Sequence, residues 1–286
     1  MEDVSNMTGE ETYAGRNSET NEVSLNGDTG KFFYFDRAQE RDPKTGKYTQ
    51  TPLDAGLTLK FDPDTGEKEI TGSKPLKVIF LKIRRTLSFY HPENGKSMRT
   101  LEHNTKYDET ILYGPEKGQR EAGTGESLRT LHDELRTIQK VYCYFPERKE
   151  VVRLVVKGSS LGSKAETPGI KKFYDYLQTY KKPDHFYEYI TEIVPIPEKG
   201  PKGIYFAMSF SRGEKLSEEQ QTKVVGLIKE IHAQTEKDDE LVKKRIGTMD
   251  KVETPREVEV SAEDFSDAKP EIEYPNEEID PADIPF

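Results

Sequence analysis

Three short segments that favour turns constrain the fold of this chain most. They read DPKTGK at 42–47, DPDTGE at 62–67 and HPENGK at 91–96. Each supplies Pro or Asp to open a turn and Gly where a positive φ is needed, and each lies between stretches rich in β-branched and aromatic residues. This spacing predicts that the first half of the chain forms antiparallel hairpins.

The longest apolar stretch, LKVIFLKIRRTLSFY at 76–90, predicts a long strand. Its first half is apolar enough for a buried central strand, whereas its second half carries cations and emerges toward solvent. At a period of two, one face of this strand presents Lys82, Arg84, Ser88 and Tyr90.

The clearest hairpin signal is KVYCYFPERKEVVRLVVKG at 140–158, with its turn at 146–149. Within its first strand, alternation predicts that Tyr142 and Tyr144 point to one side of the sheet. The short segment ETILYG at 109–114 predicts another strand.

Helical spacing of apolar residues appears in three segments. The pattern predicts helices over 127–138, over 167–182 and over 217–234. The last of them begins with a capping box made of Ser217 and Gln220. Beyond it the pattern fades into a linker rich in Pro and Glu.

These elements predict a mainly β, α+β fold. We expect an OB-fold-like antiparallel barrel elaborated with extra hairpins and two or three helices, although other antiparallel sheets with flanking helices fit the same order of elements. We expect a disordered acidic arm at 1–30, the folded domain at 31–237, and a flexible acidic linker with its tip at 238–286.

The charge of the chain is unevenly distributed. The whole chain has a net charge of -10, but 253–286 holds 12 acidic and 2 basic residues, and 1–30 holds 7 acidic and 1 basic. The intervening residues are therefore basic, with a net charge of +6. Such asymmetry indicates a basic body that binds an anionic partner and acidic ends that do not.

Several classes of protein find no support in the sequence. No apolar run is long enough to span a membrane, and the acidic N-terminus lacks the features of a secretory signal. Cys143 is the only cysteine, which excludes an internal disulfide, and the five histidines show no metal-ligand spacing. We find no catalytic or cofactor motif and expect a non-enzymatic, cytoplasmic protein without metal or cofactor.

Cations and aromatic residues alternate through the middle of the chain. Single-stranded nucleic acid needs positive charge for its phosphates and flat side chains on which unpaired bases stack. This pattern predicts a surface that binds single-stranded DNA. Its candidate residues are Lys82, Arg84, Arg85, Phe89, Tyr90, Lys140, Tyr142, Tyr144, Arg148, Lys149, Arg153, Lys157, Lys171, Lys172, Tyr180, Lys181 and Lys182.

The last residues of the chain, PNEEIDPADIPF, carry a second signal. They resemble the C-terminal tip of bacterial and phage single-stranded DNA-binding proteins, the SSB family, in which acidic residues precede Ile-Pro-Phe. The resemblance implies that the tip docks on enzymes of replication, recombination and repair. The residues that would contact these partners are Asp280, Asp283, Ile284, Pro285 and Phe286.

The sequence thus predicts a protein of a bacterial cell or a phage-infected host that coats single-stranded DNA and recruits processing enzymes. Two alternatives stay open. The chain could mimic the SSB tip and dock on host repair enzymes without binding DNA. It could also be a recombination or nuclease accessory enzyme whose carboxylates follow no recognisable motif.

Overall fold

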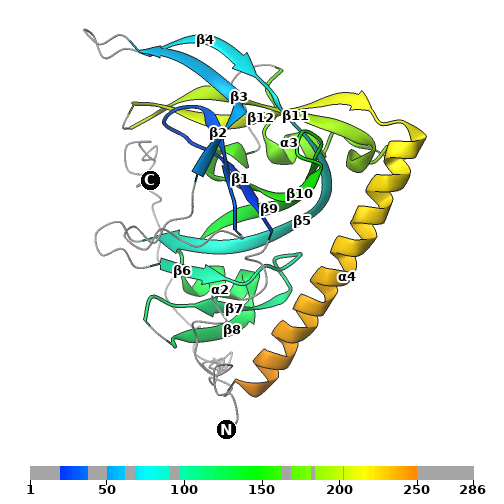
Figure 1. The fold of residues 1–286 in the computed structure, drawn as a ribbon. Coiled ribbons are helices and arrows are strands. Elements are labelled where there is room, and N and C mark those ends of the chain that lie inside the picture. The colour runs from blue at the N-terminus through cyan, green and yellow to red at the C-terminus, as the bar shows by residue number, and fades with distance from the viewer. Residues whose placement is uncertain are drawn as a thin grey trace, which may run out of the picture.

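The protein is described by a computed structural model, shown in Figure 1. The structure describes residues 20–37, 50–61, 68–90, 97–116, 118–162, 169–181, 184–201 and 203–249. The three predicted turns at 42–47, 62–67 and 91–96 lie outside these residues. The strands on either side of each turn nevertheless pair in antiparallel fashion, which confirms the predicted hairpins.

The described residues form one mixed, mainly β sheet of twelve strands. The strands are β1 (Glu22–Leu25), β2 (Lys31–Phe35), β3 (Gln50–Phe61), β4 (Lys68–Lys74), β5 (Leu76–Tyr90), β6 (Ser97–Thr100), β7 (Glu109–Tyr113), β8 (Arg120–Thr124), β9 (Arg136–Phe145), β10 (Glu150–Lys157), β11 (Tyr189–Gly200) and β12 (Gly203–Lys215). Their spatial order is β4-β3-β2-β1-β10-β9-β5-β6-β7-β8, with the β11–β12 hairpin joined to β5. Among the described strands, β1 and β10 alone pair in parallel.

Strand β5 joins the parts of this sheet. One edge of β5 pairs with β9 along most of its length, and the other edge pairs with β11 near its start and with β6 near its end. A register shift between Phe80 and Lys82 follows its most apolar part. The predicted strand at 76–90 is therefore confirmed, and so is the hairpin formed by β9 and β10 with its turn at 146–149.

The sheet curls but does not close into the expected barrel. Its end strands β4 and β8 do not pair with each other. Strand β12 approaches the β1–β2 turn, where the Phe206 N–H donates to the Gly27 carbonyl at 2.7 Å, but no ladder joins these strands in the described part of the chain. Gly30, with φ of 62°, sits where an added Cβ would clash with Leu57. The curled sheet encloses the main apolar core, in which Phe80, Phe173 and Phe210 are fully buried.

Among the residues that the structure describes, three α-helices accompany the sheet: α2 (Gly125–Leu131), α3 (Phe173–Leu177) and α4 (Glu218–Thr248). The 3₁₀ turns η2 (Gly158–Ser160) and η3 (Phe186–Glu188) connect other elements. Helices α2 and α3 are shorter than predicted. The chain leaves α2 after Leu131, and the buried Leu135 leads into β9, so the last three residues of the predicted helix, 136–138, belong to a strand.

Helix α4 is longer than predicted and runs along one side of the sheet (Figure 1). The predicted capping box of Ser217 and Gln220 is present. The expected boundary at residue 237 is wrong because Thr235 and Asp239 continue the inward-facing side of the helix with polar atoms, after which Val242 packs into an apolar cluster. Polar residues on the buried side of a helix interrupt the apolar periodicity by which the helix would be recognised in the sequence.

The folded region also begins earlier than predicted. Strand β1, at Glu22–Leu25, lies within the segment expected to be disordered and pairs with both β2 and β10. Val23 is fully buried in the main core. A four-residue strand is too short for its periodicity to stand out in a polar arm.

Candidate nucleic-acid interface

Five predicted DNA-contacting residues are buried: Arg84, Lys140, Tyr142, Arg153 and Lys172, each at most 4% exposed. A phosphate or a base can contact a side chain only at the surface, so these residues cannot form the predicted interface in this conformation. Lys172 pairs with Glu198 in the hairpin β11–β12. Arg84, Lys140 and Arg153 belong to a single polar layer, and the Tyr142 hydroxyl hydrogen-bonds to it.

We call this layer, made by Glu22, Arg84, Glu102, Lys140 and Arg153, the buried charged layer. Lys140 Nζ lies 2.7 Å from Glu22 Oε1, and Arg153 reaches Glu22 at 3.3 Å and Glu102 at 2.9 Å. Arg84 Nε lies 4.0 Å from Glu102. The layer therefore joins strands β1, β5, β9 and β10 with the segment that follows β6.

The layer continues at both ends. Asp239 of α4 accepts two hydrogen bonds from Arg84, at 3.1 and 2.6 Å, and Arg37 pairs with Glu22. Four cations thus meet three carboxylates. Buried charges persist only when they are paired, and this arrangement pairs each of them while leaving one positive charge in excess.

The pKa values reflect these contacts. Burial alone would raise the pKa of Glu22, but Lys140, Arg153 and Arg37 hold it well below its ordinary value of 4.5. Burial lowers the pKa of Lys140 to about 8, against the opposing effect of Glu22. Burial and the neighbouring Glu102 raise the pKa of Tyr142, whose hydroxyl donates to Glu102 Oε2 at 3.1 Å. Glu22 therefore stays ionised, and Tyr142 stays protonated, at neutral pH.

Two more predicted residues lie beneath α4. Lys82 Nζ donates to Thr235 Oγ1 at 2.5 Å, and burial lowers the pKa of Lys82. Tyr144 is half-buried against the first half of α4, and its hydroxyl accepts a hydrogen bond from Lys223 at 3.1 Å. The helix thus covers a part of the sheet that the sequence predicts to be open.

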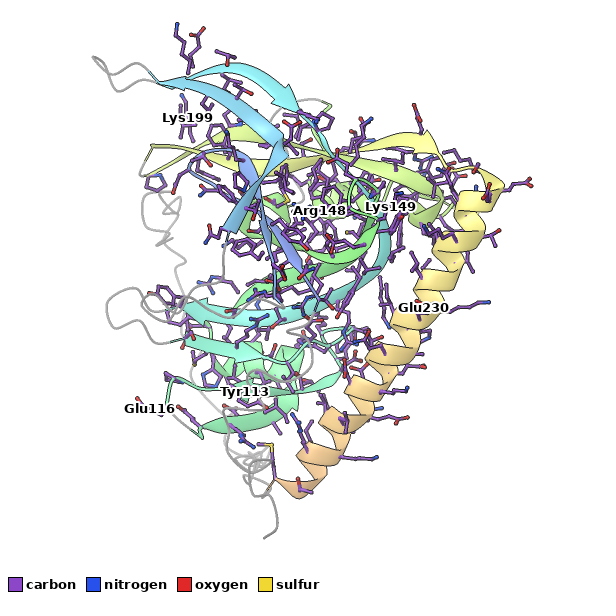
Figure 2. All side chains as sticks on the ribbon, in the orientation of Figure 1. Tyr113, Glu116, Arg148, Lys149, Lys199 and Glu230 are labelled. Atoms are coloured by element: carbon purple, nitrogen blue, oxygen red, sulfur yellow. The ribbon has the colours of Figure 1, made fainter. Side chains whose placement is uncertain are left out.

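The turn between β9 and β10 exposes two predicted cations (Figure 2). Arg148 and Lys149 are both exposed, and the Arg148 guanidinium lies 4.1 Å from the centroid of the Tyr34 ring. Lys149 adopts a φ of 55°, in the left-handed region, as the turn requires. Lys157, at the other end of β10, is also exposed.

The remaining predicted residues are scattered. Tyr90 is 62% exposed at the end of β5, whereas Phe89 faces the other side of the sheet and packs beside Leu87. Arg85 is half-buried and donates to Thr137 at 3.2 Å. Lys171 and Lys181 are exposed, Tyr180 is half-buried, and Lys182 lies outside the described residues.

Strand register identifies one surface that does combine cations with aromatic residues. Paired residues share a face, so the side that holds Lys140 and Arg153 continues to Lys157 on β10, Arg136 on β9 and Arg99 on β6. We call this surface the open sheet face. Its exposed or half-exposed members are Phe33, Phe35, Tyr90, Arg99, Arg136 and Lys157.

No known family model, curated protein or solved structure matches this chain.

The open sheet face keeps its positive charge. Within the described part of the chain, Arg99, Arg136 and Lys157 form no ion pair with a carboxylate; the Arg136 guanidinium instead donates to the carbonyls of Asp133 and Leu135. Carbonyl acceptors leave the cation's net charge unchanged. The excess charge of this face and that of the buried charged layer, which lies farther along the same strands, favour an anion on this side of the sheet.

Four members of this face were missed by the sequence analysis: Phe33, Phe35, Arg99 and Arg136. Arg136 falls inside the predicted helix at 127–138, although it continues the period-two series of β9. That series, extended backward from Lys140, is the signal that could have found it. Phe33 and Phe35 alternate with the buried Phe32 and Tyr34, which is typical of a strand with one covered face.

The predicted partner-binding residues Asp280, Asp283, Ile284, Pro285 and Phe286 lie outside the described residues. Within the described ranges, none of the helices combines the length and the apolar character needed to cross a membrane.

Proposed function

We propose that this protein binds single-stranded DNA on its open sheet face. The observation that carries the proposal is the strand register, which brings Arg99, Arg136 and Lys157 to the same side of the sheet as Phe33 and Tyr90. These elements come from distant parts of the chain.

The physical chemistry of this face suits the binding of a single strand better than the sequence-specific recognition of a duplex. Aromatic side chains accept any unpaired base, at about 1–3 kcal/mol per stacked base, and exposed cations bind phosphates without regard to sequence. A curved open sheet can serve the purpose that we expected of an OB-fold-like barrel, because it presents a continuous surface along which the strand can lie.

The DIPF motif supplies the second half of the proposal. By its resemblance to the SSB tip, the segment with Asp280, Asp283 and Phe286 recruits enzymes of DNA replication, recombination and repair in a bacterial or phage-infected cytoplasm. Phe286 can fill an apolar pocket, while the acidic residues steer the segment toward basic partners.

Titration with oligo-dT, followed by tyrosine fluorescence at low salt, tests the proposal. We expect saturable binding that weakens as salt increases. The absence of binding at low salt would contradict the proposal and favour a protein that mimics the tip without binding DNA. Loss of the oligonucleotide on addition of a divalent metal would favour the accessory enzyme.

A matched pair of variants locates the surface. We expect the triple variant Arg99→Ala, Arg136→Ala, Lys157→Ala to lose affinity. The control Lys229→Ala, Lys237→Ala, Lys243→Ala removes three exposed cations of α4 and should keep affinity near wild type. Equal losses in both variants would show that only total charge matters.

A further inference from the structure

A second aromatic cluster lies away from the open sheet face, around η3 and the ends of β11 and β12. We call it the aromatic platform and define it by Tyr180, His185, Tyr187, Tyr189 and Arg212. Only Tyr180 of these residues was singled out by the sequence.

The exposed end of the platform is a stack of two rings. His185 and Tyr187 stack with ring centroids 5.0 Å apart and planes 7° from parallel. His185 is exposed, while Tyr187 is half-buried and packs against the cluster that holds the start of α4. A stack that ends in an exposed imidazole presents a flat ring on which a further flat ring can stack.

The other rings are held in place by a shared cation. The Arg212 guanidinium lies 4.2 Å from the centroid of Tyr180 and 4.6 Å from that of Tyr189. Arg212 is itself fixed by Asp184 at 3.1 Å and by the Thr179 carbonyl at 3.2 Å. The Tyr189 hydroxyl donates to Asp184 at 3.2 Å. These contacts order the side chains before any ligand arrives, which lowers the entropy cost of binding.

Cations outnumber acids around the stack. Lys181 is exposed, and Lys215 lies 5.4 Å from the Tyr189 ring and 3.5 Å from Glu188. The Lys215 side chain is 54% exposed, so its ammonium can also contact a phosphate. Lys181, Arg212 and Lys215 against Asp184 and Glu188 leave a net charge of +1.

The platform and the open sheet face lie toward opposite ends of β9. Tyr187 packs in the same cluster as Tyr144, eight residues from Arg136 along this strand. At about 3.3 Å per residue, this separation is about 26 Å. A strand of about four nucleotides, with a rise of about 3.4 Å per stacked nucleotide, spans only about 10 Å on the open sheet face and does not reach the platform, whereas a strand of about 30 nucleotides does.

We infer that the aromatic platform is a second contact for single-stranded nucleic acid, with an unpaired base stacked on His185 and its phosphates near Lys181 and Lys215. The inference rests on the proposed function and adds a second, length-dependent site to it. Sequence-tolerant binding is expected because every base offers a flat face to the imidazole.

The test compares wild type with His185→Ala on oligo-dT of about 4 and about 30 nucleotides, the lower end of the range of about 4–16 nucleotides that one binding domain covers and a length well above that range. We expect His185→Ala to weaken binding of the longer oligonucleotide by about 5- to 10-fold, the loss of one stacked base, and to leave the shorter one unchanged. The control His232→Ala removes an exposed histidine from α4 and should change neither. Photocrosslinking with 5-iodouracil in the longer oligonucleotide should label the segment 185–189.

Unchanged affinity of His185→Ala for the longer oligonucleotide, without a crosslink in this segment, would overturn the inference. If the open-face triple variant still lost affinity in that case, the proposed function would stand. Failure of wild type to bind either length would overturn both.

Discussion

The buried charged layer and the open sheet face lie on the same side of the same strands, yet they differ in accessibility and in partners. On β9, Lys140 is buried against Glu22, whereas Arg136, four residues earlier, is exposed. On β10, Arg153 is enclosed by two carboxylates, whereas Lys157 projects into solvent. Position along a strand therefore separates a cation that holds the fold together from one that can bind a ligand.

The positions of the carboxylates, more than those of the cations, therefore determine which part of this sheet face is buried and paired and which part stays open. Glu22 and Glu102 together contact every cation of the layer, and Asp239 adds the contact with α4. Where these carboxylates do not reach, the cations face outward. Breaking the layer should therefore cost stability, whereas removing open-face cations should cost affinity alone.

The largest expected effect follows from Glu102→Gln. This change leaves Arg84 and Arg153 buried without one of their counter-charges, and we expect the free energy of unfolding to fall by about 3 kcal/mol. Chemical denaturation measures the change. The control Glu230→Gln, on α4 in Figure 2, should stay within about 0.5 kcal/mol of wild type. A loss of less than about 1 kcal/mol in Glu102→Gln would mean that the layer is not a structural element.

A smaller loss is expected when α4 is released from the layer. Asp239→Asn removes the carboxylate that binds Arg84 through two hydrogen bonds, and we expect a loss of about 2 kcal/mol. The neighbouring Glu240 is exposed, so Glu240→Gln serves as the matched control and should have almost no effect. Equal stability of the two variants would contradict the role of Asp239.

A pH effect should distinguish Glu22 from surface carboxylates. Its pKa in the folded protein lies below its ordinary value, so the unfolded chain binds more protons as the pH falls through about 4.5. Stability is therefore fully present above that pH and decreases below it. We expect the decrease to be shallower in Glu22→Gln, measured by denaturation between pH 6 and pH 3, about two units around the ordinary value. Parallel curves for the two proteins would rule out this contribution.

Local patterns predicted the local structure well. Turn residues and alternation located the β5 strand and the β9–β10 hairpin, and the capping box located the start of α4. The end of α4 was missed because Thr235 and Asp239 interrupt its apolar stripe. Barrel closure was also mispredicted, since sheet closure depends on how distant strands pair rather than on any one segment.

The candidate site was predicted only in outline. Period-two spacing correctly placed Arg84, Ser88 and Tyr90 on one face of β5, but it could not show that Asp239 and Glu102 would neutralise Arg84. Lys140 and its partner Glu22 are separated by 118 residues in sequence. Only the folded chain brings such partners together, so local sequence cannot separate buried cations from exposed ones.

The salt dependence of oligo-dT binding tests the central claim most directly. Each phosphate contact on a single strand contributes about 0.7 to the slope of log K against log salt concentration. The triple variant Arg99→Ala, Arg136→Ala, Lys157→Ala should therefore have a slope shallower by about 2, with an unchanged unfolding midpoint. A slope equal to that of wild type and of the α4 control would show that the open sheet face does not bind DNA.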